Sequence, residues 1–294
     1  MATLDSTMTA AATRQSPRRA SLWRDMLRHP SALAGLAILV MLGLACSFGP
    51  LLSGQDPTTQ NLSEALLPSS AKHPLGTDGL GRDELVRLLY GGRYSMLLGL
   101  AAAAIGIGIG LPIGAISGYY GGRLDLVVQA VNDVLLSFPG ILLALSLVAG
   151  LGVGLQNVTI AVAISSIPAF VRLARASALS IRELEYARAA VAIGQTKPRI
   201  VLLHVIPNSL APVIVQASLQ VGTAILVAAG LGFLGLGVQP PTPEWGSMLG
   251  DSRNYIFRAP VLSTYPGLAI FVVVIGFNLL GDGLRDVLDP RLRR

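Results

Sequence analysis

Long stretches without a charged residue constrain this chain more than any other feature of its sequence. Five windows lack Asp, Glu, Lys and Arg altogether: residues 30–55, 94–122, 134–171, 200–243 and 259–281. A charged side chain at the centre of a bilayer costs roughly 2.5 to 3.5 kcal/mol, and a helix needs about 20 apolar residues to cross the hydrocarbon. Windows of this length therefore predict helices that span a membrane.

The composition agrees with this interpretation. Charged residues make up 13% of the 294 positions, about half the roughly 25% of soluble domains, and the mean hydropathy is +0.62. The single cysteine, Cys46, has no second thiol with which to form an internal disulfide or a zinc site. These values exclude a disordered chain, a disulfide-stabilised domain and an ordinary soluble enzyme, and they indicate an all-α integral membrane protein.

The five windows predict six spans. The first, second and fifth hold one helix each, whereas the third is about twice as long. Its middle, from Gly150 to Asn157, is rich in glycine and predicts a turn between two helices. In the fourth window one helix fits at roughly 209–231, because the glycines and prolines of 235–243 stop it.

The distribution of basic residues predicts the orientation of these spans. With the N-terminus inside, Lys and Arg number 16 in the inner connections and 6 in the outer ones. Basic residues concentrate on the cytoplasmic side of membrane proteins, so we expect both termini to be cytoplasmic and the chain to be a multi-pass protein of the cell (inner) membrane. The basic residues are scattered and not interleaved with aromatics, which favours contact with lipid headgroups and argues against binding of nucleic acid.

The sequence contains no motif typical of a catalytic site or of energy coupling. The sequence contains no H-E-x-x-H or G-x-S-x-G pattern, no Cys or His pattern with metal-ligand spacing, and no Walker A loop. The charge-free windows also lack the ionisable groups with which a carrier couples to protons or sodium. Asp125 and Asp133 fall near the predicted cytoplasmic edge, where we expect them to be solvated or paired with Arg123. We predict a transporter that takes its energy from a partner, with an ion-coupled secondary transporter as the alternative of another class.

The longest predicted cytoplasmic connection, residues 172–208, is organised in a way that suits contact with the partner that supplies this energy. Residues 183–193 predict a helix, Gly194 a turn, and Pro198 the first turn of a second short helix that Pro207 ends before the next span. Alanines along the first helix allow another surface to approach closely. A solvated helical hairpin without a partner is the other interpretation of this segment.

This connection resembles the EAA loop of ABC importer permeases, in which E-A-A-x-x-x-G is followed by a hydrophobic residue and proline. The resemblance implies a coupling helix in the loop 185–207 that seats in a cytoplasmic ATPase subunit. Four positions match the motif directly, while an arginine stands where the motif has glutamate and a glutamate lies one turn earlier. The implied ATPase-coupling residues are Glu185, Arg188, Ala189, Ala190, Gly194 and Pro207.

Further stretches are similar to the C-type permease of dipeptide, oligopeptide and nickel importers: residues 73–83 with 91–95, 118–123, 233–246 and 278–290. The resemblance covers residues 20–294 and implies the ABC importer type I transmembrane fold. It also implies a homologous permease, two cytoplasmic ABC ATPase subunits that bind ATP and Mg, and an extracytoplasmic substrate-binding protein, with no cofactor in this chain. Di- or oligopeptides are the expected substrates, and nickel, glutathione or another small solute the alternatives.

Two of these stretches also have a physical interpretation on the predicted outer face. Gly76 and Gly81 with the charged residues between and after them predict a compact turn pinned by carboxylate hydrogen bonds and an ion pair. The prolines of 240–243 predict a stiff extended segment that places the residues after it near the membrane interface. We expect an outer gate or docking surface here, and rigid plugs without partner contact are the alternative. The candidate residues are Asp78, Arg82, Asp83, Glu244 and Trp245.

The sequence thus divides into five predicted segments. A disordered cytoplasmic tail, 1–20, precedes a segment, 21–70, that holds an interfacial helix, the first span and the start of the outer loop. The outer loop continues through 71–93, the five-span core follows at 94–285, and a cytoplasmic tail ends the chain at 286–294.

Overall fold

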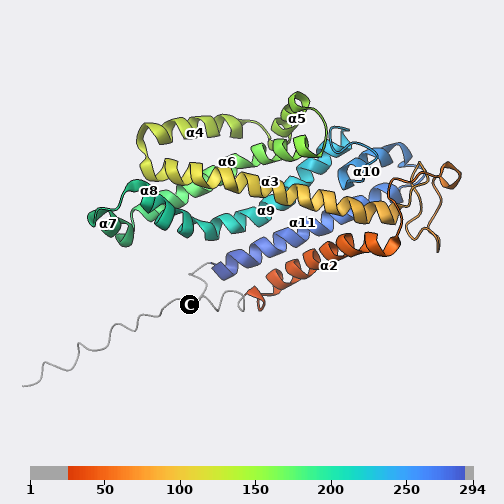
Figure 1. Ribbon diagram of the computed structural model, residues 1–294, viewed down its shortest axis with the longest axis horizontal. Helices are drawn as coiled ribbons and strands as arrows, with labels where there is room; N and C mark the ends of the chain where they lie inside the picture. Colours follow the sequence, from red (N-terminus) through yellow and green to blue (C-terminus); the bar gives the residue numbers. More distant parts are fainter. Residues whose placement is uncertain (1–25, 289–294) are drawn as a thin grey trace, which may run out of the picture.

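The computed structural model describes residues 26–288. The predicted disordered tail, residues 21–25 of the predicted interfacial helix and the chain from residue 289 onward lie outside the described residues. Within the described range the long helices run side by side along one axis (Figure 1). Five of them are long and apolar enough to cross a membrane: α2 (Pro30–Ser53), α3 (Glu84–Tyr120), α6 (Leu155–Arg182), the continuous segment Lys197–Phe233 that ends with α9 (Ile206–Phe233), and α11 (Val261–Leu288).

A sixth candidate crossing consists of two helices that meet at a sharp bend. α4 (Gly122–Ser137) and α5 (Gly140–Leu151) pass the same test together and are bent by 92°. The break falls where Pro139 follows Phe138, whose backbone is extended at φ −89° and ψ 135°. A residue before proline is pushed out of the helical region, so the bend has a local cause. The all-α fold is confirmed, and six crossings are reached with this bent pair counted as one.

The bent pair is held to α6 by ion pairs. Arg175 on α6 contacts both carboxylate oxygens of Asp125 on α4, at 2.7 and 2.6 Å, and Arg172 lies 3.1 Å from Asp133. The sequence predicts that these acids are solvated or paired with Arg123. Asp133 is indeed exposed, but pairing with Arg123 is wrong, because helix packing brings Arg175 and Arg172 of α6 alongside α4. The two acids follow each other on α4 in the reverse order of their partners on α6, so the two helices run in opposite directions.

The beginning of α2 and the end of α11 meet at the same end of the bundle. His29, directly before α2, lies 3.3 Å from Asp286 near the end of α11, and Figure 1 shows the two helix ends side by side. An even number of crossings requires this placement. Which side of the membrane faces the cytoplasm stays a prediction.

Glycines allow α3 and α6 to approach closely. Gly106, Gly110, Gly114 and Gly118 occupy successive turns of α3 and face α6. A Cβ atom at Gly114 would lie 2.3 Å from the carbonyl oxygen of Val171, and one at Gly118 would lie 2.7 Å from that of Arg175. Small residues at this spacing bring helix backbones together in membranes, where packing rather than water drives association.

The predicted helix end at Pro207 is wrong. α8 (Lys197–Ile200) continues through a π turn, Val201–Val205, directly into α9. Proline removes a donor and crowds the carbonyl four residues earlier, and the wider π turn takes up both effects, with the N–H of Ile206 bonded to the carbonyl of Val201. Two further carbonyl groups of the π turn accept hydrogen bonds from side chains of the next helical turn. Asn208 donates to the carbonyl of His204 at 2.6 Å, and Ser209 donates to that of Val205 at 2.8 Å.

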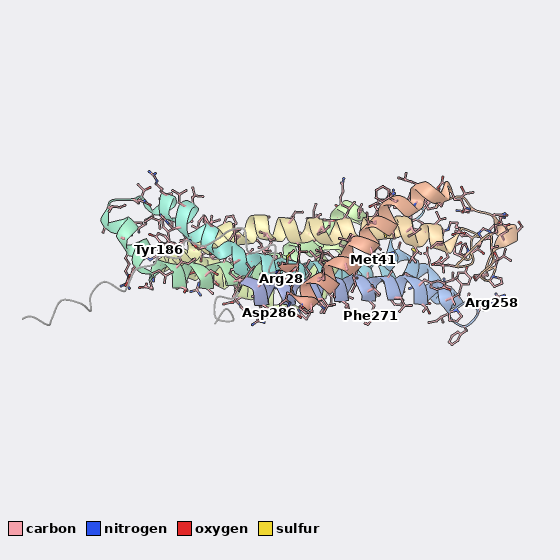
Figure 2. All side chains as sticks on the ribbon, turned by 90° about the horizontal axis from the view of Figure 1, so that it is seen from below. Arg28, Met41, Tyr186, Arg258, Phe271 and Asp286 are labelled. Atoms are coloured by element: carbon pink, nitrogen blue, oxygen red, sulfur yellow. The ribbon has the colours of Figure 1, made fainter. Side chains whose placement is uncertain are left out.

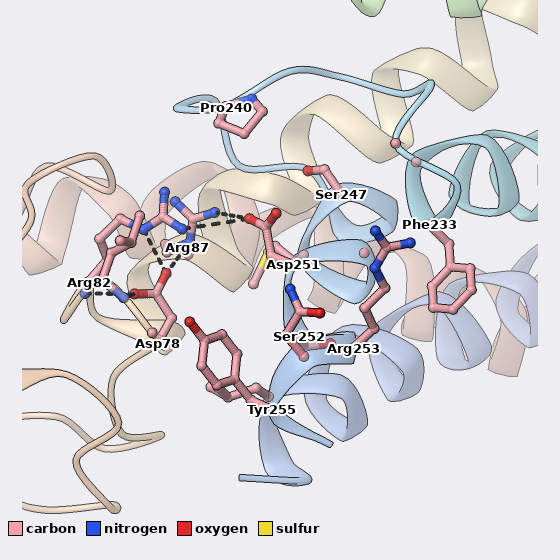
Figure 3. A pocket seen from close by; sticks show the side chains of 18 of the residues that line it. Asp78, Arg82, Arg87, Phe233, Pro240, Ser247, Asp251, Ser252, Arg253 and Tyr255 are labelled. Carbon is pink, nitrogen blue, oxygen red and sulfur yellow. Dashed lines mark hydrogen bonds and ion pairs between the residues drawn. The ribbon is translucent and has the colours of Figure 1, made fainter. Parts of the chain in front are cut away.

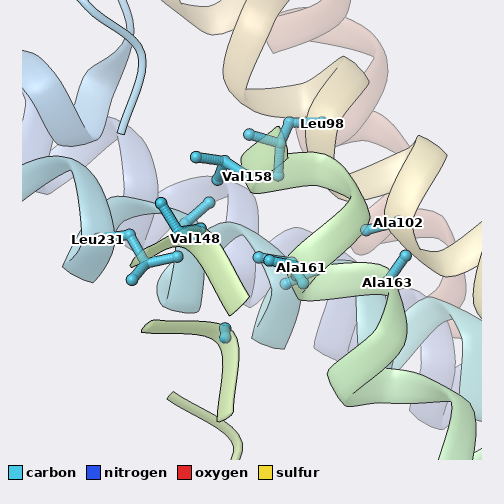
Figure 4. Packing of buried hydrophobic residues seen from close by; sticks show 11 residues of the cluster. Leu98, Ala102, Val148, Val158, Ala161, Ala163 and Leu231 are labelled. Atoms are coloured by element: carbon cyan, nitrogen blue, oxygen red, sulfur yellow. The ribbon is translucent and has the colours of Figure 1, made fainter. Parts of the chain in front are cut away.

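Buried side chains fill the spaces between these helices. One cluster joins α3, α5, α6 and α9 and contains Leu98, Val148, Val158 and Leu231 (Figure 4). The outward side chains are also apolar, as in Met41 on α2 and Phe271 on α11, which are 70% and 59% exposed (Figure 2). A bundle that is apolar on its outside as well as its inside fits lipid surroundings.

Candidate functional site

One end of the bundle carries a separate helical hairpin beyond the long helices (Figure 1). α7 (Glu185–Ala192) packs against the body through Ala187 and Ala190, which are 2% and 4% exposed. Ala190 belongs to a buried cluster that also contains Ile200 and Val205. The opposite side of the hairpin is apolar and open, with Tyr186, Val191 and Ile193 exposed. We call this end of the bundle the α7 end.

The structure brings five of the six predicted coupling residues together on this hairpin. Ala190 faces the body, and the other four are exposed: Glu185, Arg188, Ala189 and Gly194. Gly194 follows α7 at φ +82°, a backbone conformation that favours glycine, and no atom lies within 4 Å of where its Cβ would be. Pro207 lies apart from the hairpin, on the helix that returns into the bundle.

Arg188, which stands at the position of the motif glutamate, has an acidic partner. Its Nη2 lies 2.6 Å from Glu183, which also contacts Arg182 at 3.3 Å. Hydrogen bonds from Arg188 and then Arg182 hold the pKa of Glu183 below its ordinary value. The glutamate that the sequence placed one turn before Arg188 is Glu185, but the partner in the structure is Glu183, before the start of α7.

The opposite end, which we call the α10 end, begins with the predicted compact turn. Asp78 accepts from the backbone N–H groups of Leu80 and Arg82, both at 2.9 Å, and from Nε of Arg82 at 2.6 Å. Gly76 and Gly81 adopt φ +83° and +72° in this turn. Asp83 caps α3 by accepting from the N–H of Val86 and holds Nδ1 of His73 at 2.8 Å.

Glu244 and Trp245, the other predicted pair, are buried against α3. They stand at the start of α10 (Trp245–Ser252) and are 2% and 1% exposed. The Glu244 carboxylate accepts from Ser95 at 2.7 Å and from the N–H of Ser247 at 2.9 Å, and the Trp245 indole donates to the carbonyl of Leu88 at 2.9 Å. Burial raises the pKa of Glu244 against the lowering effect of these hydrogen bonds and one from Gly246.

Four residues at the α10 end were not singled out from the sequence: Glu84, Arg87, Asp251 and Tyr255. They line a cavity of about 440 Å³ together with Asp78 and Arg82, between the turn before α3, the segment after α9 and α10 (Figure 3). Arg87 is 2% exposed and lies 3.4 Å from Asp78 and 3.9 Å from Asp251. Glu84 and Arg87 share one face of α3, and this helical spacing next to the predicted turn was the signal that could have found them.

None of these groups forms a metal site, since no cluster of three or more potential ligands occurs within residues 26–288. The chemistry available at the α10 end is hydrogen bonding and charge. At the α7 end it is an exposed apolar surface with basic residues around it.

Family models match most of the chain. Residues 110–294 match the model described as binding-protein-dependent transport system inner membrane component. Residues 18–68 match the model of the N-terminal transmembrane domain of oligopeptide transport permease C.

Curated relatives are similar along nearly their whole length. A dipeptide transport system permease protein of Alkalihalophilus pseudofirmus is 47% identical over 277 residues, which cover 93% of this chain and 91% of that protein. A probable D,D-dipeptide transport system permease protein of Escherichia coli is 44% identical, covering 89% and 88%. A glutathione transport system permease protein of Pectobacterium atrosepticum is also 44% identical, covering 92% and 90%.

The fold has a solved counterpart. An inward-facing structure of the MetNI methionine ABC transporter superposes with a TM-score of 0.56, at 21% identity, over 68% of this chain and 95% of that one. At this identity the likeness concerns the arrangement of the helices.

Proposed function

The chain belongs to the family of inner membrane components of binding-protein-dependent transport systems, and we propose that it forms half of the translocation path of an importer for di- or oligopeptides. It is a multi-pass membrane permease subunit, and the family makes it a transporter rather than an enzyme. The ATPase of such ABC systems is a separate subunit, which is where ATP and magnesium belong. Membership therefore favours an ATP-driven importer over a self-contained ion-coupled carrier.

The names of the relatives support a peptide substrate. Two of the three relatives above are named for dipeptides and one for glutathione. Glutathione uptake is accordingly the alternative within this function, and nickel or another small solute has weaker support.

The open face of α7 carries the coupling part of this proposal. Tyr186 and Ile193 are 44% and 77% exposed at the far end of the molecule, and Figure 2 shows Tyr186 at the opposite end from Arg258. Apolar side chains that project into water rather than lipid indicate a protein partner. We place an ATPase subunit on this face, on the cytoplasmic side together with both termini.

A push on α7 has a direct route into the membrane. The buried face of α7 packs on the cluster that contains Ala115 of α3, Ala178 of α6 and Val205 before α9. When two ATPases close on ATP, each pressing on one permease of a pair, α7 displaces the ends of these three spans. The path then opens outward toward the loaded binding protein.

At the α10 end the five predicted residues act as a scaffold for the outer gate in this proposal. Asp78, Arg82, Asp83, Glu244 and Trp245 are all largely buried, so they hold the shape of the surface and leave contact with the binding protein to exposed neighbours. Phe257, which is 99% exposed after α10, is one such neighbour.

Reconstituted uptake tests the function. The permease with its partner permease, two ATPases and binding protein is placed in vesicles, and uptake of a labelled dipeptide, glutathione and nickel is compared with and without ATP. We expect ATP-dependent uptake of the dipeptide, with less of glutathione and none of nickel. ATP-independent uptake driven by a proton gradient would overturn the importer.

Co-purification tests the partner on α7. Ile193→Asp places a charge on the open apolar face, and we expect it to lower recovery of the ATPases about tenfold. Ile256→Asp, at a 49% exposed isoleucine of the α10 end, is the matched control and should leave recovery unchanged. Equal recovery with both variants would remove the ATPase from this face.

A further inference from the structure

The cavity at the α10 end has the size and the burial of a small-molecule site. Its volume of about 440 Å³ falls within the roughly 300–1,000 Å³ of ligand pockets. Four charged residues in its wall are at most 8% exposed: Asp78, Arg82, Glu84 and Arg87. Asp251 stands at its mouth with a side chain 47% exposed, and Figure 3 shows both guanidinium groups turned toward it.

Glu84 leaves an acceptor unused in this wall. Glu84 is 2% exposed, and its Oε1 atom is buried without a hydrogen-bond partner among the described residues. Leaving a buried polar atom unpaired destabilises the fold, and more so when the atom is charged. Asp78, by contrast, is fully engaged by the turn and by Arg82, so Glu84 is the acceptor that remains for a ligand.

The two buried arginines leave donors unused on the other side of the same cavity. Arg82 is bonded through Nε to Asp78, and Arg87 through Nη1 to the carbonyl of Pro57. Their Nη2 atoms both approach one oxygen of Asp251, at 3.6 and 3.9 Å, which is longer than a hydrogen bond. The exposed carboxylate of Asp251 is thus a loosely held occupant that another carboxylate can replace.

Acids and arginines are equal in number in the lining of the cavity. Asp78, Glu84 and Asp251 face Arg82 and Arg87, with Arg253 also in the lining. A molecule that carries an ammonium and a carboxylate group finds acids and arginines in the same lining.

We propose that this cavity is a binding site for a short zwitterionic peptide at the entrance of the translocation path. The ammonium group donates to Glu84, and the carboxylate replaces Asp251 on Arg82 and Arg87. The inference rests on the proposed function, which supplies the peptide. It adds a place in this chain where the two charged ends are recognised after release from the binding protein.

Ligand-observed NMR tests the site in the assembled importer. The two permeases with their ATPases are embedded in nanodiscs without the binding protein, and alanylalanine is titrated as the probe. We expect saturable binding in the millimolar range. Acetylation of the amino group, or amidation of the carboxyl group, should weaken it at least tenfold.

Two variants shift this binding in opposite directions. Glu84→Gln should weaken alanylalanine about tenfold, whereas Asp251→Asn should tighten it several-fold, because the competing carboxylate is gone. The gain in Asp251→Asn should vanish with the amidated peptide. Asp56→Asn, at an exposed carboxylate of the same end that does not line the cavity, is the control without effect.

The possible failures separate the site from the function. ATP-driven peptide uptake with the binding protein, combined with equal binding of blocked and free alanylalanine or with none at all, overturns the site and leaves the importer standing. Absence of peptide uptake overturns the peptide substrate and the site with it. If Glu84→Gln does not assemble, acetylated and amidated peptides on the wild-type complex still decide the question.

Discussion

The Ser95 hydroxyl donates to the Glu244 carboxylate across 2.7 Å and joins two segments that are 149 positions apart. The same hydroxyl accepts from the backbone N–H of Trp245 at 3.1 Å. Gly92 lies beneath the indole, where a Cβ atom would come within 2.7 Å of the Trp245 ring. These contacts hold α10 against α3 and make the first turns of α3 and the short helix α10 one unit.

Removing the Ser95 hydroxyl should destabilise this joint. Ser95→Ala leaves a buried carboxylate oxygen and a buried N–H without their partner, so we expect a loss of about 1–3 kcal/mol. Thermal unfolding of the purified protein in detergent measures it as a lowered Tm. Ser146→Ala, at an exposed serine that bonds only within its own helix, is the control, and an equal shift in both would contradict the role of the joint.

The buried carboxyl of Glu244 should make stability depend on pH. Burial raises its pKa in the folded state above the unfolded value of about 4.3. Its contribution is therefore full below that value and is lost as pH rises through the folded pKa. We expect the Tm of wild type, relative to Glu244→Gln, to fall as pH rises from about 4 toward neutrality.

Glu183 should give a pH dependence of stability opposite to that of Glu244. Arg188 and Arg182 lower its pKa, so its contribution is present above the unfolded value and is lost as pH falls through the folded pKa. Wild type relative to Glu183→Gln should lose Tm toward acid pH, by a small amount because the pair is exposed. The same slope for both variants would show that neither carboxyl causes the dependence.

The glycines between α3 and α6 give a sharp test of helix packing. Gly114→Ala puts a Cβ atom 2.3 Å from the Val171 carbonyl oxygen, and we expect a loss of about 1–3 kcal/mol from overpacking. Gly108→Ala lies on the same helix with no atom within 4 Å, and it should be neutral or stabilising by up to about 1 kcal/mol. Tm values of the two variants in one detergent decide the matter, and a stable Gly114→Ala would mean that the helices stand further apart.

The turn after α7 should matter for coupling rather than for insertion. Gly194→Val introduces a β-branched residue at φ +82° in open space, so the strain falls on the turn itself. We expect the reconstituted importer to hydrolyse ATP while uptake per ATP falls at least fivefold. Gly54→Val, at φ +59° and equally open, imposes similar strain at the opposite end and should keep coupling intact.

Counting charges located the five long apolar helices, because the cost of a charge in lipid adds up residue by residue and needs no knowledge of neighbours. It did not predict the bent pair, since α4 carries Arg123, Asp125 and Asp133 and begins outside the charge-free window 134–171. The same rule misplaced the start of the second span. α3 begins at Glu84, ten residues before the charge-free window, since Arg87 is buried in protein and paired with Asp78. A charged residue can therefore lie within a spanning helix where other helices and loops shield it from lipid.

Contacts between distant segments were beyond the sequence. The sequence shows the motif that contains Ser95 and the motif that contains Glu244. Neither motif indicates that these two side chains are hydrogen-bonded to each other. The α3 glycines at intervals of four are a visible signal of close helix packing, which the total glycine content does not reveal. The helix end predicted at Pro207 is wrong for a local reason. Proline often ends a helix, and the residue pattern does not predict the π turn that accommodates this proline.

The π turn at Val201–Val205 means that this helix holds one residue more than an α-helix of the same length needs. Each α-helical residue turns the chain by about 100°. Deleting a single residue there would allow ordinary bonding and, at the same time, swing everything before it around the axis by that angle. The extra residue of the π turn therefore sets the direction in which the α7 hairpin points, and a deletion there would change that direction without altering either the hairpin or the membrane helix.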